Sequence, residues 1–152
     1  AEANIALLID GDHVAPSAFA PLLSALSAHG CVAVRRFYTV AHKADLWRDA
    51  LKQHGIDPVI VPRSAGGLKD AADMVIALDA AELSLRPSRT GARHLTGIAV
   101  ASEDADFALL LQRVRKWGLE AFAATLAPDG FVHCVSRRVW EEAGAMVVPY
   151  AG

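Results

Sequence analysis

The chain has 152 residues, of which 53% are hydrophobic and 21% are charged, which suffices for one globular domain with a buried core. Its net charge of −2 excludes a globally basic nucleic-acid binder but permits a local basic patch. No apolar run reaches the roughly 18 residues of a membrane-spanning helix, and no signal-peptide pattern opens the chain. We therefore expect one soluble, cytoplasmic domain over 1–152, with Cys31 and Cys134 reduced and in the core.

Apolar runs predict the elements of the first half of the chain. A nearly continuous run at 4–9 is typical of a strand buried on both faces. Helical spacing of apolar residues after Pro16 predicts a helix that ends near Gly30. The same criteria predict three further elements, which are a strand at 31–38, a helix at 45–55 and a strand at 58–62.

The second half continues the alternation of helix and strand patterns. An alanine-rich segment from 69 to about 85 favours a helix, and a loop with three arginines follows it at 86–94. The remaining predicted elements are strands at 97–102, 119–125 and 145–150, with helices at about 105–117 and 135–143. This alternation implies βαβ units, hence a three-layer α/β fold in which helices cover both faces of a parallel sheet.

Acidic side chains are predicted at one edge of this sheet. Asp10 ends the first strand, and Asp104 and Asp106 follow the fourth. Ligands of open parallel sheets bind outside the carboxyl ends of the strands, so these carboxylates converge if the first and fourth strands are neighbours where the strand order reverses. The middle helix presents only one face to this crevice, and three of its acids compete for a further place: Asp70, Asp73 and Asp79.

Converging carboxylates either take up protons or are neutralised by a divalent cation. A set of oxygen ligands favours Mg²⁺ or Mn²⁺. Such an ion activates a water molecule and stabilises the charge that develops on a phosphodiester. The pattern therefore indicates metal-dependent hydrolysis of a nucleic-acid backbone.

Three motifs in order resemble the NYN branch of the PIN-like nucleases: LLIDGDH at 7–13, KDAAD at 69–73 and ASEDADFALLLQRVRKWGLEAF at 101–122. The resemblance extends over nearly the whole chain and implies a metal-dependent ribonuclease with a Rossmann-like parallel sheet. It implies an acidic cluster that is both catalytic and metal-binding, formed by Asp10, Asp73, Asp104 and Asp106. It also implies that Lys69 lies close to this cluster and that Ser102 is the small residue ahead of the acidic pair.

Two positions depart from the residues that are usual in this family. His13 stands where Asn is usual, and Glu103 stands where Gly is usual. His13 can still donate a hydrogen bond to a phosphate or a bound water. Glu103 either adds charge close to the metal site or points to solvent from the first helical turn, where the helix dipole favours an acid.

The expected partner is RNA, in single-stranded form, whereas a homodimer and a further RNA-binding domain in a longer parent chain are left open. The arginine loop is either a phosphate-binding element or an ordinary charged surface. The predicted substrate-binding residues are Lys69, His13, Ser102, Arg86, Arg89 and Arg93. The three tryptophans lie within helix patterns and are predicted core residues rather than platforms for bases: Trp47, Trp117 and Trp140.

Two other functions compete with the nuclease interpretation. DGDHV at 10–14 fits the D-x-D-x-[TV] pattern of haloacid dehalogenase-like phosphatases, in which Asp10 would be the nucleophile and Asp12 the general acid/base. Otherwise, Asp12 is a turn residue or an additional metal ligand. The third interpretation is a non-catalytic RNA-binding or scaffold domain, although phosphate binding alone favours Lys and Arg over carboxylates.

Overall fold

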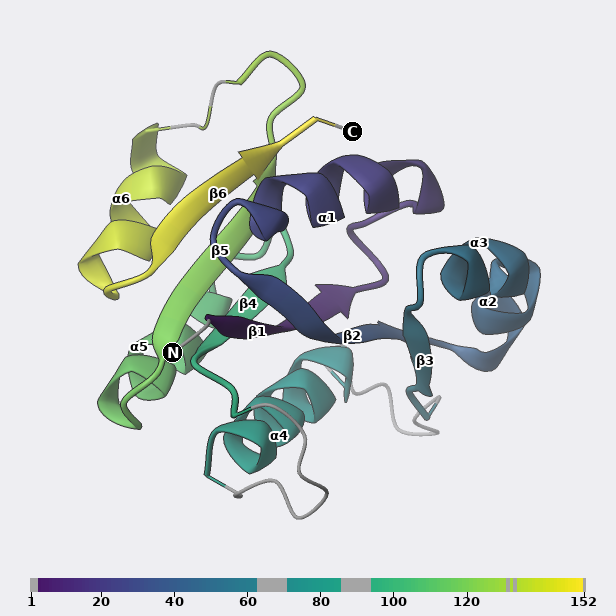
Figure 1. The fold of residues 1–152 in the computed structure, drawn as a ribbon, viewed down its shortest axis with the longest axis horizontal. Helices are drawn as coiled ribbons and strands as arrows, with labels where there is room; N and C mark the ends of the chain where they lie inside the picture. The colour runs from purple at the N-terminus through teal and green to yellow at the C-terminus, as the bar shows by residue number, and fades with distance from the viewer. Residues whose placement is uncertain (1–2, 63–70, 86–93, 131, 133, 152) are drawn as a thin grey trace.

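A computed structural model of the chain describes residues 3–62, 71–85, 94–130, 132 and 134–151. Within these ranges, six parallel strands form one sheet in the order β3-β2-β1-β4-β5-β6 (Figure 1). The strands are β1 (Asn4–Asp10), β2 (Cys31–Thr39), β3 (Asp57–Ile60), β4 (Gly97–Ala101), β5 (Glu120–Leu126) and β6 (Met146–Tyr150). The helices are η1 (Pro16–Ala18), α1 (Phe19–Ser27), α2 (Ala41–Leu46), α3 (Arg48–Gln53), α4 (Ala71–Leu85), α5 (Phe107–Lys116) and α6 (Cys134–Glu142).

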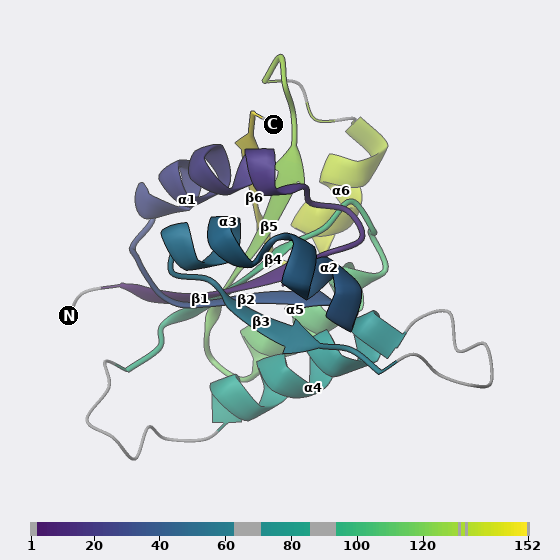
Figure 2. The same cartoon turned by 90° about the vertical axis from the view of Figure 1, so that its right-hand side faces the viewer.

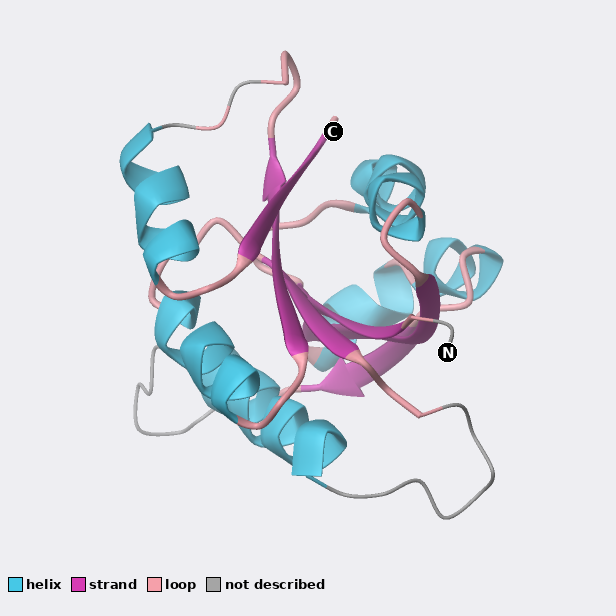
Figure 3. Ribbon diagram, turned by 60° about the vertical axis from the view of Figure 1, so that its left-hand side comes forward, coloured by secondary structure: helices cyan, strands magenta, loops and turns pink. Residues whose placement is uncertain are grey.

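The predicted three-layer α/β architecture is confirmed. The side chains of α1 and α3 join the core on one face of the sheet, whereas those of α4, α5 and α6 join the core on the other. Figure 3 shows helices on both sides of the sheet. Every residue of β1 and of β4 is buried, as expected for central strands that are covered on both faces.

The point at which the strand order reverses lies between β1 and β4, which meets the condition under which the acidic residues after these two strands were expected to converge. Ile9 of β1 is in register with Ala101 of β4, and Asp10 is in register with Tyr38 of β2. Side chains alternate along a strand, so Asp10 lies on the same face as Leu8, which belongs to the core beneath α4 and α5. The last residue of β1 therefore projects its carboxylate toward the layer of α4 and α5.

Gly11 lets the chain leave β1 close to β2. Its N–H donates to the Tyr38 carbonyl oxygen over 2.9 Å. A Cβ atom at this position would lie against that same carbonyl oxygen and 2.9 Å from the Phe37 ring. Only glycine fits here without displacing β2, which explains the glycine directly after the acidic residue.

Three details differ from the sequence predictions. The helix predicted at 45–55 forms instead as α2 and α3, because Trp47 leaves helical geometry with φ −105° and ψ 16°. Cys31 is exposed at the first position of β2 rather than in the core. The side chain of Cys134 lies outside the described part of the chain.

The prediction for the tryptophans is confirmed. Trp140 is almost completely buried, and Trp47 and Trp117 are partly buried against the two core clusters. No helix in the described ranges is both long enough and apolar enough to span a bilayer.

Candidate active site

The turn that follows β1 fixes the carboxylate of Asp10. This residue is only 2% exposed. Its Oδ1 atom accepts a hydrogen bond from the Asp12 N–H over 3.2 Å, and its carbonyl oxygen accepts from the N–H groups of His13 and Val14. An aspartate that accepts from the backbone two residues later is the usual Asx turn. The sequence DGDH therefore folds so that a buried carboxylate sits at the carboxyl edge of the sheet.

Ser102, the first residue after β4, connects Asp10 with the acidic segment that follows. It is 1% exposed, and its hydroxyl donates to Asp10 Oδ2 over 2.9 Å. The Ser102 Oγ atom in turn accepts from the backbone N–H of Asp104 over 3.0 Å. The small residue thus joins the ends of β1 and β4 into one hydrogen-bonded unit.

His13 completes this unit. Its Nδ1 atom lies 2.9 Å from Ser102 Oγ and 3.2 Å from Asp10 Oδ2. The serine hydroxyl has one proton, which it donates to Asp10, and an ionised carboxylate only accepts. We infer from this network that His13 Nδ1 carries a proton and donates. The opposite edge of the ring, with Nε2, is then directed away from Ser102, and the side chain is 38% exposed.

Asp104 and Asp106 lie in the turn that opens α5. The half-buried Asp104 accepts the Asp106 N–H at its Oδ1 atom over 2.9 Å, so one carboxylate oxygen stabilises the turn before the helix. The Asp106 side chain is exposed and makes no capping bond at the start of α5. Of this acidic pair, Asp104 is the member that the hydrogen-bonded unit of Asp10, Ser102 and His13 contacts directly.

Glu103 extends in another direction. Its Oε1 atom accepts the backbone N–H of Leu126 over 2.7 Å, at the end of β5. Because β5 lies on the side of β4 opposite to β1, this carboxylate is directed away from Asp10. Burial raises the pKa of Tyr150 to about 12, and the charge of Glu103 adds to this effect. The exposed acid at the family's glycine position thus holds the end of a neighbouring strand.

Asp73 lies in the first turn of α4 and is half-buried. Figure 2 shows that α4 begins on the side of the molecule where β3 ends, so this first turn lies at the carboxyl edge of the sheet. It also lies in the helix layer toward which Asp10 projects. Within the described ranges, no three His, Cys, Asp or Glu side chains are placed to hold one metal ion together.

Several predicted site residues lie outside the described part of the chain, namely Lys69, Asp70, Arg86, Arg89 and Arg93. The first described residue after the arginine segment is His94. Its backbone carbonyl oxygen accepts a hydrogen bond from the Asn4 side-chain amide over 3.1 Å. Asn4 begins β1, so this flank of the segment lies at the amino edge of the sheet, opposite to Asp10.

Asp79, which competed with Asp73 for a place in the site, faces β2. Its Oδ2 atom accepts the Tyr38 hydroxyl over 2.7 Å and lies 3.4 Å from Arg36 Nη1. Burial, together with the adjacent Asp79, raises the pKa of Tyr38. Asp79 therefore makes a polar contact between α4 and β2, with Tyr38 and Arg36, and belongs neither to a solvated surface nor to the crevice.

One charged residue of this edge was missed by the sequence analysis. Lys43 lies in α2, which follows β2, and its Nζ atom is 3.8 Å from Asp12 Oδ1. Asp12 is 68% exposed and turns toward this cation rather than toward Ser102. Because β2 is the other neighbour of β1, the rule that predicted Asp104 at this edge also predicts the residues directly after β2.

The comparisons with known proteins agree with this topology. A family model described as NYN domain matches residues 4–139. Among solved structures, the chain is similar to a protein of unknown function from Vibrio parahaemolyticus RIMD 2210633, with a TM-score of 0.67 and 19% identity. The similarity covers 97% of this chain and 93% of the other, and at this identity it shows the fold alone. No curated protein is significantly similar.

Proposed function

Because the chain belongs to the NYN domain family, we propose that it is a metal-dependent ribonuclease that hydrolyses phosphodiester bonds of single-stranded RNA. The NYN family is a PIN-like nuclease family, which supports a nuclease role in general. One observation carries the proposal. The buried carboxylate of Asp10 is joined through Ser102 to the backbone of Asp104, at the point where the strand order reverses.

The chemistry of this donor set fits a divalent cation. Asp10 is buried, and its partners are two neutral donors, the Ser102 hydroxyl and the Asp12 backbone N–H, together with His13 Nδ1. A buried carboxylate is costly without a compensating positive charge, and the nearby Lys43 contacts Asp12 instead. Mg²⁺ commonly binds one or two carboxylates together with water and substrate phosphate oxygens. Asp10 and Asp104 would hold such an ion, and Asp73 and Asp106 are proposed as further contributors.

The bound ion would supply an activated water and would stabilise charge on the phosphodiester. The chain's own residues have two other tasks. Ser102 and His13 hold the Asp10 carboxylate in one orientation, through donors at 2.9 Å and 3.2 Å from the same oxygen. The outer edge of the His13 ring, with Nε2, faces away from Ser102. When both ring nitrogens carry a proton, Nε2 can donate to a phosphate oxygen, which is the role proposed for this residue in substrate binding.

The test compares three carboxylate-to-amide changes. Asp10→Asn and Asp104→Asn alter the proposed site, whereas Asp12→Asn makes the same chemical change at an exposed neighbour. Calorimetry with Mg²⁺ and Mn²⁺ and cleavage of end-labelled single-stranded RNA are measured on the same samples. We expect the first two variants to lose metal binding and cleavage and the third to retain most of both.

Two results would contradict this proposal. Cleavage at the wild-type rate in folded Asp10→Asn and Asp104→Asn protein would show that the site lies elsewhere. Hydrolysis of a phosphomonoester that both Asp10→Asn and Asp12→Asn abolish would instead support the phosphatase mechanism. The outward direction of Asp12 toward Lys43 is unfavourable for that mechanism, because a general acid must reach the substrate bound at the nucleophile.

A further inference from the structure

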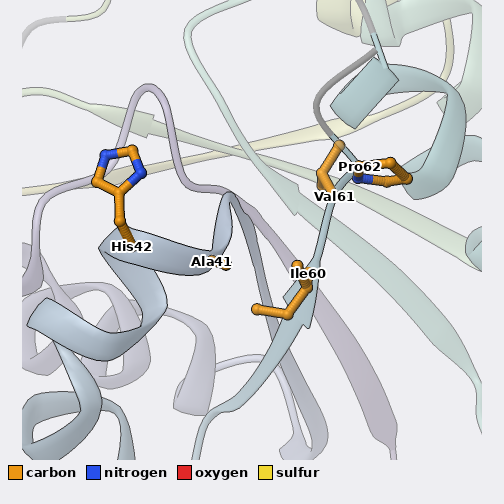
Figure 4. Close-up of a pocket in the computed structure, with 5 residues that line it drawn as sticks. All are labelled: Ala41, His42, Ile60, Val61 and Pro62. Carbon is orange, nitrogen blue, oxygen red and sulfur yellow. The ribbon is translucent and has the colours of Figure 1, made fainter. Parts of the chain in front are cut away.

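A depression lies at the carboxyl edge of the sheet, between the start of α2 and the end of β3 (Figure 4). Its volume is about 590 Å³, within the range of small-ligand sites. The described residues that line it are Ala41, His42, Ile60, Val61 and Pro62. Ile60 is 50% exposed although it is a large aliphatic residue. An aromatic imidazole therefore stands beside an otherwise apolar wall.

The depression and the Asp10 site lie along the same edge. The Val61 N–H donates to the Thr39 carbonyl oxygen over 2.8 Å, and the Gly11 N–H donates to the Tyr38 carbonyl oxygen over 2.9 Å. The segments that leave β1, β2 and β3 thus follow one another. Neighbouring strands are about 4.8 Å apart, so the ends of β1 and β3 are separated by roughly 10 Å. A nucleotide next to one whose phosphate lies at Asp10 can reach the depression.

A cation lies between the two features. Lys43 follows His42 in α2, and its Nζ atom is 3.8 Å from Asp12 Oδ1 and 5.9 Å from the centre of the Trp47 ring. The edge thus presents the Asp10 carboxylate, then an ammonium group, then the apolar depression with an imidazole ring. Single-stranded RNA offers matching groups in the same order, because its phosphates pair with cations and its unstacked bases stack on aromatic side chains.

We propose that this depression binds a nucleobase of the RNA strand, on the nucleotide next to the one whose phosphate is cleaved at Asp10. His42 stacks on the base, and Ile60 and Pro62 form the apolar wall. Lys43 pairs with the phosphate that links these two nucleotides. Among its described lining residues, His42 alone has a polar side chain, so stacking rather than hydrogen bonding dominates and several bases are accepted. This inference rests on the proposed ribonuclease function.

The test combines base removal with side-chain removal. A short RNA with a single cleavage position is made in versions that carry one abasic nucleotide at each position around that site. Wild type, His42→Ala and Ile60→Ser are compared with Met146→Ser, which alters an equally exposed aliphatic residue on the opposite edge strand. We expect one abasic position, and likewise His42→Ala, to raise KM about tenfold with little change in kcat. Combining the two raises KM no further, because both remove the same contact.

The outcomes separate this inference from the proposed function. If wild type cleaves the RNA but His42→Ala behaves as Met146→Ser does, the depression serves another ligand and the inference is overturned while the ribonuclease stands. Multiplicative effects of His42→Ala and of every abasic position would also overturn it, because the base would then bind elsewhere. If wild type neither binds nor cleaves RNA, both the inference and the proposed function fail.

Discussion

Replacing Ser102 by alanine removes the group on which the site network depends. Its hydroxyl is the neutral donor to the buried Asp10 Oδ2 atom and the acceptor for the Asp104 N–H. A hydrogen bond to a charged group contributes roughly 1.5 to 3 kcal/mol. The lost acceptor adds less, because Asp104 is only half-buried. We therefore expect Ser102→Ala to lower the free energy of unfolding by about 3 kcal/mol, a substantial part of a typical domain's roughly 5 to 15 kcal/mol.

The assay is denaturation by urea and by heat in the presence of a chelator, so that bound metal does not contribute. For a chain of this length, about 3 kcal/mol corresponds to a decrease in Tm of roughly 6 to 12 °C. Ser27→Ala is the matched control, because the Ser27 hydroxyl donates to the Leu23 carbonyl oxygen on an exposed helix surface. Equal, small losses in both variants would refute the reasoning, since they would show that the Ser102 hydroxyl does not support a buried charge.

Three further outcomes are expected. Mg²⁺ or Mn²⁺ at about one hundred times its Kd should stabilise wild type by about 2.7 kcal/mol in thermal scans, and Asp10→Asn should abolish the gain. Burial raises the pKa of Tyr150 to about 12, above its unfolded value near 10. The contribution of the neutral Tyr150 side chain to the free energy of unfolding is therefore complete below pH 10 and lost as the pH rises to about 12. Tyr150→Phe should flatten this alkaline loss of stability in urea titrations. Gly11→Ala should destabilise by about 1 to 3 kcal/mol in urea, because its Cβ would meet β2.

Each of these expectations has a result that contradicts it. Equal stabilisation of wild type and Asp10→Asn by the metal would place the ion at other ligands. Unchanged alkaline unfolding in Tyr150→Phe would assign that loss to other groups, with Tyr38 the first to examine because its pKa is raised as well. A Gly11→Ala protein as stable as wild type would show that β2 moves aside at little cost.

The central strands and the position of Asp10 were predictable because each depends on a local pattern. An unbroken apolar run can only be a strand or helix segment buried on all sides, and the acid and glycine that end it mark the exit from the sheet. The succession of βαβ units predicted a parallel sheet, whereas the neighbouring position of β1 and β4 entered as a condition that the strand order now meets. Asp10, Ser102 and Asp104 could therefore be assigned to one edge before any side-chain contact was known.

The remaining site contacts depend on geometry that no local pattern fixes. Helical arithmetic places Asp73 and Asp79 roughly 120° apart, which shows that the two cannot share a face but not which one faces β2. The Tyr38 hydroxyl decides this, and it belongs to a strand far away in the sequence. Glu103 likewise meets the N–H of Leu126 across the sheet edge. Such contacts follow from tertiary packing, so the sequence left both alternatives for Glu103 open.

The histidine at position 13 shows how a departure from a family's usual residue can preserve a site. In asparagine, the amide nitrogen is bonded to Cγ, and in histidine Nδ1 is bonded to Cγ as well, so both residues can present an N–H at the same place. His13 Nδ1 is within 2.9 Å of Ser102 and 3.2 Å of Asp10. The substitution therefore keeps the donor that the Asp10 network requires and adds a second ring nitrogen at the outer edge. Loss of the acidic site does not follow from this exchange, and the retained donor favours an intact site over a decayed one.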